Sequence, residues 1–555
     1  MKAAELIVRC LEAEGVRHIF GVPGEENIEF LKNIASSGIH FVTARDERGA
    51  SFMAAGWGRL TGRPGVCLST LGPGAMNLLT GVADAYLDFA PMIAITAQKS
   101  LSETFREAHQ YIDIMSIYKP VTKWGASIGG KNIPDIIKKA FRVAQAEKPG
   151  PVHLELPEDV ACMDAQGQPL PPYQPVHPEP AKSDITAALE LIKSASNPLV
   201  VAGNGVLRAG ASAALLKFIR KFNLPAAVTF MALGAVPADD PLYISTVGLQ
   251  QRDFITCGLE KADLIITIGF DPVEFNPASW SKKADEKMLA KSVVHISATP
   301  AEAEFPFKSL ELIGDIKKTL SILTRAGDFS RPAPAYFMKI RELAHNGLDI
   351  GMYGNKDGGK DGQSPPKPSR IVRAMREALD KKDILISDVG AHKIWIARFY
   401  EAFSPNTVLI SNGLASMGFA IPTAISAKLL CPERKVLAAV GDGGFMMSLS
   451  ELETARRLGV SFPVLIFNDG AYGLIGWKER MRFGEEFGVQ FGNPDFMALA
   501  GAFGAKGYRV EKPQDLGMVL REALAANTIS IIDCPVDYSG NMELTKKLGS
   551  ITCPM

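Results

Sequence analysis

Four short apolar runs, each of the length of a buried strand, lead into glycine-rich turns. The runs cover residues 16–20, 66–70, 198–202 and 436–440, and the turns begin at residues 21, 72, 203 and 441. Such runs are typical of strands in a parallel sheet, and glycine lets the chain turn sharply there and approach a ligand closely. Ligands of open α/β sheets bind at the carboxyl ends of the strands. The sequence therefore predicts α/β domains with candidate ligand sites at these turns.

Two segments of different composition divide the chain. With 555 residues, the protein is too long for one hydrophobic core. A proline-rich segment at residues 168–175 and a polar, glycine- and lysine-rich segment at 354–368 are typical of linkers. We therefore expect three doubly wound parallel-sheet α/β domains, at residues 1–165, 183–345 and 369–555.

The charge balance and the cysteine pattern argue against several classes of function. Lysine plus arginine equals aspartate plus glutamate, at 60 each, which gives no electrostatic basis for binding nucleic acid or a membrane surface. No apolar run is long enough to span a bilayer and the N-terminus lacks a signal-peptide core, so we expect a cytoplasmic protein. Seven cysteines between Cys10 and Cys553, with no Cys-x-x-Cys pair, argue against a disulfide framework and a zinc site.

The turn at residues 441–444, Gly-Asp-Gly-Gly, is the strongest candidate site. The next apolar run, residues 463–467, ends at Asn468-Asp469. Neighbouring parallel strands end side by side, so Asp442 and Asp469 could hold one cation. Mg²⁺ takes about six oxygen ligands and is often bound by one or two carboxylates plus substrate phosphates. A slip of one residue would make Asn468 the second ligand instead of Asp469.

Two further patterns lie near the predicted strand ends. Ser448 and Glu451 have the spacing of a capping box, which predicts that a helix begins there. Glu47 stands between a predicted strand at 39–44 and a predicted helix at 50–59, where it is either a site residue or part of an exposed charge run. The turn at 203–210 is an alternative nucleotide site, although its third glycine comes too late for the Gly-x-Gly-x-x-Gly pattern.

Glu47, the turn at 72–77, the turn at 441–444 and Asp469 together resemble the thiamine diphosphate-dependent enzymes. The closest resemblance is to acetolactate synthases, especially catabolic ones, and four segments carry it: His109 to Asp113, Phe270 to Glu274, Glu451 to Ala455 and Val536 to Ser539. The resemblance implies a pyrimidine-binding, a middle and a diphosphate-binding domain. It also implies thiamine diphosphate and Mg²⁺ as cofactors. The activity that it implies decarboxylates pyruvate and joins the two-carbon unit to a second 2-keto acid.

The resemblance assigns a role to each candidate residue. It places Glu47 against the pyrimidine ring, Met417 beneath the folded cofactor and Gln110 near the substrate. Asp442, Asp469 and the carbonyl of Ala471 are the implied metal ligands. The other implied cofactor contacts are Gly74, Asn77, His392, the carbonyl of Ala415, Gly441, Gly443, Gly444 and Tyr472.

Several alternatives remain open at this point. FAD occurs in many biosynthetic relatives, but Phe270-Asp271-Pro272-Val273-Glu274 departs from their Arg-Phe-Asp-Asp-Arg segment, which counts against it. Trp477 resembles a tryptophan with which biosynthetic enzymes favour 2-ketobutyrate, so the acceptor is undecided. The runner-up activities are another thiamine diphosphate-dependent decarboxylase or carboligase and, in a different class, an FAD- or nucleotide-binding protein. The resemblance also implies a homodimer or homotetramer with active sites shared between subunits.

Overall fold

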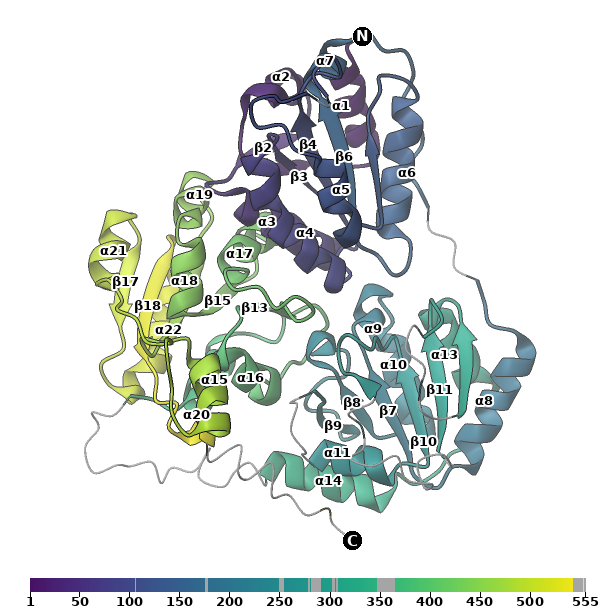
Figure 1. Cartoon of the computed structure of the whole chain (residues 1–555). Helices are drawn as coiled ribbons and strands as arrows, with labels where there is room; N and C mark the ends of the chain where they lie inside the picture. Colours follow the sequence, from purple (N-terminus) through teal and green to yellow (C-terminus); the bar gives the residue numbers. More distant parts are fainter. Residues whose placement is uncertain are drawn as a thin grey trace.

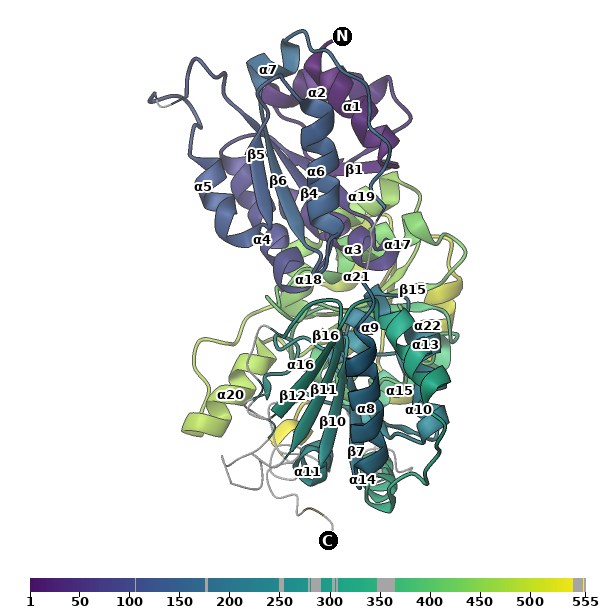
Figure 2. The same cartoon turned by 90° about the vertical axis from the view of Figure 1, so that its right-hand side faces the viewer.

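Three separate parallel sheets of six strands organise the chain (Figure 1). This computed structural model describes residues 1–104, 106–174, 178–248, 254–277, 280, 291–301, 305, 308–346, 365–542 and 553. Each sheet has helices on both faces (Figure 1 and Figure 2), which confirms the predicted α/β class. No helix in these ranges is long and apolar enough to cross a bilayer.

The first sheet lies within the first 165 residues and has the strand order β2-β1-β3-β4-β6-β5. Its strands are β1 His18–Gly21, β2 His40–Thr43, β3 Gly65–Ser69, β4 Met92–Gln98, β5 Trp124–Ser127 and β6 Pro151–Pro157. Its helices are α1 Ala3–Ala13, α2 Ile28–Ala35, α3 Glu47–Thr61, α4 Pro73–Leu87, α5 Ile114–Tyr118, α6 Ile133–Gln145 and α7 Glu158–Cys162.

The second sheet forms the middle of the chain, with the order β12-β11-β10-β7-β8-β9. Its strands are β7 Pro198–Ala202, β8 Ala226–Val228, β9 Tyr243–Thr246, β10 Leu264–Ile268, β11 Ser292–Ser297 and β12 Lys308–Ile313. Its helices are α8 Lys182–Ser194, α9 Gly205–Arg208, α10 Ser212–Phe222, α11 Phe254–Lys261, α13 Ile316–Ala326 and α14 Ala335–Asn346.

The third sheet closes the chain, with the order β14-β13-β15-β16-β18-β17. Its strands are β13 Ile384–Ser387, β14 Val408–Ile410, β15 Val436–Gly441, β16 Pro463–Asn468, β17 Lys506–Arg509 and β18 Ser530–Pro535. Its helices are α15 Pro368–Ala378, α16 Ala391–Phe399, α17 Ala420–Leu430, α18 Asp442–Ser448, α19 Glu451–Arg457, α20 Gly473–Phe483, α21 Phe496–Ala502 and α22 Leu516–Ala525.

Helices α3, α4 and α17 pack where the N-terminal and C-terminal domains meet (Figure 1). The small residues of α3 allow a close crossing, since a Cβ at Gly56 would lie 2.7 Å from Thr423 Cγ2 and 2.7 Å from Ser426 Oγ. Phe52 and Phe419 meet edge to face, with ring centroids 5.8 Å apart. One continuous apolar core therefore joins the two domains.

The two predicted linkers have different outcomes. Residues 168–174 form no helix or strand between the first and second sheets, as expected of a linker. Most of the second predicted linker, residues 354–364, lies outside the described residues.

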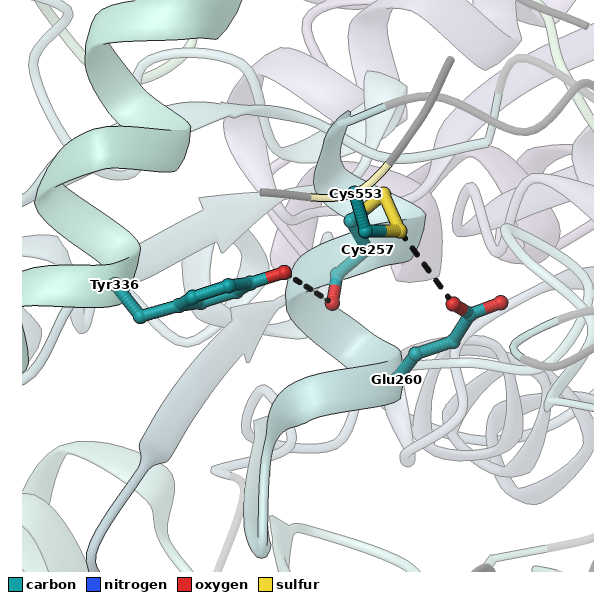
Figure 3. Close-up of a disulfide and its surroundings, with 4 residues drawn as sticks. All are labelled: Cys257, Glu260, Tyr336 and Cys553. Carbon is teal, nitrogen blue, oxygen red and sulfur yellow. Dashed lines mark hydrogen bonds between the residues drawn. A yellow bond between two sulfur atoms is a disulfide. The ribbon is translucent and has the colours of Figure 1, made fainter. Parts of the chain in front are cut away.

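A disulfide joins Cys257 of α11 to Cys553 near the C-terminus (Figure 3). The cysteine pattern argued against disulfides, and for this pair that expectation is wrong. The two cysteines are separated by 296 residues, so no local spacing signal marks them. The backbone carbonyl of Cys257 also accepts a hydrogen bond from the Tyr336 hydroxyl at 3.5 Å, which ties α11 to α14.

Candidate active site

Helix α18 begins at Asp442, directly after β15. Gly441 has an extended backbone at the N-cap position and Asp442 is the first helical residue. A helix does begin at Glu451, as predicted, but Ser448 is the last residue of α18 and the N-cap of α19 is Ser450, so the predicted capping box is wrong. The Glu451 carboxylate instead accepts the backbone N–H groups of Arg45 and Asp46, at 3.0 and 3.1 Å. It thereby fastens α19 to the segment that precedes α3.

Asp442 is buried and its carboxylate is held at both oxygens. Oδ1 accepts the Gly443 N–H at 2.8 Å, and Oδ2 accepts the Gly470 N–H at 2.7 Å and Asn493 Nδ2 at 2.8 Å. The parallel pairing of β15 with β16, with Gly441 opposite Phe467, places the two strand ends at one edge. Burial and the negative charge of Asp442 raise the pKa of Asp469 to about 7. Two carboxylates so close to each other create a site that favours a cation.

The side-chain amide of Asn468 is hydrogen-bonded to other protein groups. Its Nδ2 donates to Asp533 Oδ1 at 2.8 Å, and its Oδ1 accepts from Asn493 Nδ2 at 3.0 Å. The amide group of Asn468 is thus engaged on both sides by the protein, which favours Asp469 as the second ligand. Sequence reasoning missed Asn493, which lies 51 residues after Asp442 and supports both strand ends.

Ala471 lies in an isolated antiparallel bridge with Gln490. The hydrogen bonds of this bridge use the neighbouring Tyr472 N–H, which donates to Val489 O at 2.9 Å, and the Gly470 carbonyl, which accepts from Phe491 N at 3.0 Å. The bridge thus fixes the backbone at Ala471 without using its carbonyl, which remains suitable as a third oxygen ligand.

The glycines of the 441–444 turn lie against side chains that leave no room for a Cβ. At Gly443 a Cβ would be 3.0 Å from Tyr472 Cε1 and 3.3 Å from Met417 Cε. At Gly444 it would be 2.5 Å from Asp388 Oδ2. The turn therefore brings Met417 and Tyr472, both predicted cofactor residues, next to the diphosphate motif.

His392 lies beneath the same turn, with its ring stacked on Phe467 at a centroid distance of 5.2 Å. A Cβ at Gly441 would lie 3.4 Å from its Cε1. Burial lowers the pKa of His392 to about 3, so the ring is neutral. Its Nε2 is buried and has no hydrogen-bond partner among the described residues, as expected of a group that meets a ligand.

The predicted wedge lies on the loop of residues 411–418, between β14 and α17. Ala415 has a positive φ of 57°, which is unusual for a residue with a side chain. The Asp388 carboxylate holds the end of the loop, because it accepts the Gly418 N–H at 3.0 Å and the Phe419 N–H at 3.2 Å. Ala415 and Met417 are thus held in a defined and strained loop beside Gly443.

A second cluster lies on the N-terminal domain, around Glu47. This residue opens α3, where Asp46 caps the helix by accepting the Arg48 N–H at 2.7 Å. Glu47 is only 8% exposed, and its Oε2 accepts a hydrogen bond from Asn77 Nδ2 at 3.1 Å. A Cβ at Gly74 would lie 3.0 Å from Glu47 Oε1. The structure therefore brings together three residues from two predicted motifs, and Glu47 is not an exposed charge.

Gln110 lies over the start of α4. It has a positive φ of 61°, and its backbone carbonyl would be 2.7 Å from a Cβ at Gly72. Its side chain is exposed, so the loop carries Gln110 at the edge of the Glu47 cluster.

The two clusters come from segments that touch within one chain. An Arg48 guanidinium nitrogen donates to the Met447 carbonyl, and Glu451 holds the backbone just before Glu47. The structure thus forms one group around Glu47, Gly74 and Asn77, and a second around Asp442, Asp469, Met417, Tyr472 and His392.

Comparison with known proteins shows the family of the chain. Residues 1–117, 185–323 and 388–534 match the N-terminal TPP binding domain, the central domain and the C-terminal TPP binding domain of thiamine pyrophosphate enzymes. Acetolactate synthase of Bacillus subtilis is 34% identical over 550 residues, which cover 98% of this chain and 94% of the relative. The chain belongs to the thiamine pyrophosphate enzymes.

Other relatives of this thiamine pyrophosphate enzyme carry similar names. The catabolic acetolactate synthase of Raoultella terrigena is 35% identical, over 98% of this chain and 97% of its own length. The large subunit of acetolactate synthase isozyme 1 of Escherichia coli is 30% identical, over 96% and 94%. The Asp442 cluster lies in the matched C-terminal TPP binding domain, and the Glu47 cluster in the matched N-terminal one.

Proposed function

We propose that the protein is an acetolactate synthase, which decarboxylates pyruvate on thiamine diphosphate and joins the two-carbon unit to a second 2-keto acid. The near full-length similarity to acetolactate synthases is the main support for this proposal. The fold also brings the residues of each predicted cofactor motif together.

The residues present fit the cofactor and its metal. Among the described residues no group of three or more histidine, cysteine, aspartate or glutamate side chains could hold a metal. Asp442 and Asp469 stand at neighbouring strand ends. With the Ala471 carbonyl they would provide three oxygens for Mg²⁺, and the diphosphate would contribute others, as is usual for this ion. The diphosphate would lie at this glycine turn, where the Cβ positions of Gly443 and Gly444 are filled by neighbouring side chains, and the unpartnered Nε2 of His392 lies beneath the same turn.

Bound thiamine diphosphate supplies a thiazolium carbon that takes up the 2-keto acid and accepts the electrons released by decarboxylation. The protein positions groups around it. Glu47 is oriented by Asn77 and would share a proton with the pyrimidine ring. The Ala415 carbonyl and the Met417 side chain would hold the folded conformation of the cofactor. Gln110, at the edge of the Glu47 cluster, would contact the substrate.

A nucleotide or FAD site at the turn of residues 203–210 has an argument against it in the structure. The Glu274 carboxylate already accepts the Asn204 N–H at 3.1 Å with each oxygen, and the Gly205 N–H donates to the Gly269 carbonyl at 2.8 Å. A phosphate would have to displace a buried carboxylate to reach these N–H groups. The geometry therefore favours thiamine diphosphate binding over FAD or nucleotide binding at the turn of residues 203–210.

Two measurements test the proposed function. We expect thiamine diphosphate with Mg²⁺ to raise the melting temperature, because a ligand that binds the native state increases its apparent stability. Incubation with pyruvate should then give acetolactate. If acetaldehyde forms instead, the protein is a simple decarboxylase. If the melting temperature responds only to FAD or a nucleotide, the alternative class is correct.

A homodimer with shared active sites is part of the proposal. Large apolar side chains near both clusters are exposed in the single chain, including Met76 beside Asn77 and Met446 in α18, at 43% and 42%. Exposed apolar groups around a site are typical of an interface. A second copy of the chain would cover them and complete each site with its own Glu47 cluster.

A further inference from the structure

The loop of residues 411–418 is anchored by a helix from a different domain. Asp84 and Asp88 lie one turn apart on α4 and its C-cap, at 1% and 2% exposure. Asp84 Oδ1 accepts the Ser411 hydroxyl at 2.6 Å, and its carboxylate also accepts the Ser416 N–H. Asp88 accepts the Asn412 N–H at 3.2 Å and the Gly413 N–H at 2.6 Å. The two carboxylates thus bind both ends of a six-residue stretch.

The contact is close and leaves no space for adjustment. A Cβ at Gly413 would lie 2.6 Å from both the Cβ and the carbonyl oxygen of Leu87. Arg59 Nη1 is 3.4 Å from Asp88 Oδ2, and Lys393 Nζ donates to the Ser411 carbonyl at 2.8 Å. Burial and the neighbouring Asp88 raise the pKa of Asp84, and burial lowers that of Lys393.

Four charged side chains are buried at this domain contact: Asp84, Asp88, Arg59 and Lys393. Burying charges costs free energy, and apolar side chains of similar size often stabilise a buried contact as well or better. Stability alone therefore gives a poor account of these four groups. The loop that they hold carries Ala415, whose positive φ of 57° persists only when its surroundings fix it. Asp388 fixes the other end, through Gly418 and Phe419.

We propose that Asp84 and Asp88 are positioning residues for cofactor activation, because they hold the loop that presents the Ala415 carbonyl and the Met417 wedge. The inference rests on the proposed function. It adds that the N-terminal domain of a chain shapes the diphosphate-domain site of the same chain, through α4.

The proposal predicts a specific defect. The proposed metal ligands lie at the ends of the paired strands β15 and β16, and neither Asp84 nor Asp88 is hydrogen-bonded to them, so cofactor affinity should be preserved. The folded conformation of the cofactor depends on the loop, and a misplacement of about 1 Å at a reacting group can slow a step by about a hundredfold. Activation should therefore slow while binding does not.

The test uses Asp84→Asn, which keeps the shape but replaces one acceptor oxygen by a donor. Ser411→Ala removes the same hydrogen bond from the loop side with a smaller change. Asp240→Asn is the matched control, because Asp240 is equally buried and hydrogen-bonded to Arg220, at 2.7 Å, but lies in the middle domain. Two quantities are measured: the dissociation constant of thiamine diphosphate with Mg²⁺, and the rate of deuterium exchange at the thiazolium carbon of the bound cofactor after acid quench.

We expect Asp84→Asn to slow exchange about tenfold or more and Ser411→Ala to slow it severalfold, with dissociation constants within about threefold of wild type. The control should exchange at the wild-type rate. Unchanged exchange in both test variants would overturn the proposal, as would an equal slowing in Asp240→Asn. If Asp84→Asn does not fold, Ser411→Ala decides alone. A wild-type protein that binds no thiamine diphosphate would instead overturn the proposed function.

Discussion

At the scale of single residues, the candidate metal site depends on which of two adjacent side chains faces Asp442. The spacing of the motifs left Asn468 and Asp469 as alternatives, because a predicted strand end is uncertain by a residue. The structure favours Asp469, because Asn468 is engaged with Asp533 and Asn493. Asn493 could not be predicted, since an asparagine in a loop 51 residues away carries no pattern that marks it.

Replacing each of the two residues tests this assignment. Asp469→Ala should abolish Mg²⁺-dependent binding of thiamine diphosphate, because one carboxylate alone holds Mg²⁺ poorly. Asn468→Ala should keep the metal and weaken cofactor binding by about tenfold at most, through loss of a supporting hydrogen bond worth about 1 kcal/mol. Isothermal titration with and without Mg²⁺ separates the two. The reverse pattern would show that Asn468 is the ligand.

Glu47→Gln tests the role of the second cluster. Gln keeps the size of the side chain but has no carboxyl proton to share with the pyrimidine ring. We therefore expect deuterium exchange at the thiazolium carbon of the bound cofactor to slow by about a hundredfold or more. Cofactor affinity should change little. The control is Glu155→Gln, a buried glutamate on β6 of the same domain, which is hydrogen-bonded to Gln98 at 3.1 Å and lies outside both clusters. An equal effect of the two substitutions would contradict the assignment.

At the scale of elements, the sequence predicted all the central strands and two of the six edge strands, β2 and β14. The other four edge strands, β5, β9, β12 and β17, were missed. An edge strand is exposed on one side, so strands such as β5 and β17 lack the continuous apolar run that marks a buried parallel strand.

The helix start at Asp442 was missed for a related reason. Ser448 and Glu451 match the pattern of a capping box, but the glycine turn had already directed the chain into α18. Besides the local Thr454 hydroxyl, the Glu451 carboxylate binds the backbone of Arg45 and Asp46, about 400 residues away in sequence. Long-range partners of this kind leave no local signal.

The crossing of α3 and α17 gives a prediction for stability. Gly56→Ala places a methyl group 2.7 Å from Thr423 and Ser426, and this overpacking should reduce the free energy of unfolding by about 1–3 kcal/mol. Gly501→Ala is the control, because Gly501 is exposed on α21 with open space around its Cβ position. There alanine should stabilise by up to about 1 kcal/mol. Urea denaturation measures both, and a Gly56→Ala protein as stable as wild type would disprove the close crossing.

Glu274, beside the glycine turn after β7, gives a prediction for pH. Burial raises its pKa from 4.5 to about 7, so the native state keeps a proton that the unfolded state has lost. Between pH 4.5 and 7 the native state binds more protons, and stability must fall as the pH rises. At about 1.4 kcal/mol per pH unit this amounts to roughly 3 kcal/mol.

Glu274→Gln removes that proton equilibrium. The stability of wild type relative to Glu274→Gln should therefore fall by roughly 3 kcal/mol between pH 4.5 and 7.5, as measured by urea denaturation at several pH values. The exposed Glu190 on α8 provides the control, since Glu190→Gln should show no such trend. A difference that does not vary with pH would mean that Glu274 is ionised in the native state throughout.

At the scale of the whole molecule, the sequence predicted three α/β domains correctly, but it did not predict which distant segments contact each other. The disulfide from Cys257 to Cys553 and the apolar core shared by α3 and α17 both join residues far apart in sequence. Composition and motif spacing describe local segments, and neither reports which distant segments meet.

The shared-site proposal predicts the outcome of mixing two inactive variants. Glu47→Gln and Asp442→Ala damage different halves of a site, so in a mixed dimer one site would carry both changes and the other neither. With random subunit exchange, half of the dimers are mixed and half of their sites are intact, so activity should return to about a quarter of wild type. If both residues serve a site within one chain, mixing restores nothing. Each variant exchanged with itself is the control.

Helix α4 has a role at each end, and this has a consequence for the dimer. Its first turns carry Gly74 and Asn77 against Glu47, and its last turn and C-cap carry Asp84 and Asp88 against the loop of residues 411–418. At a rise of about 1.5 Å per residue, about 16 Å separates Asn77 from Asp88. In a dimer with shared sites, the N-terminal end of α4 would lie at the cofactor bound by the partner's diphosphate domain. Its C-terminal end would hold the loop at the diphosphate site of the same chain. Occupancy of one site would then alter cofactor activation at the other, and the rate of hydrogen exchange per bound cofactor should differ between half and full occupancy.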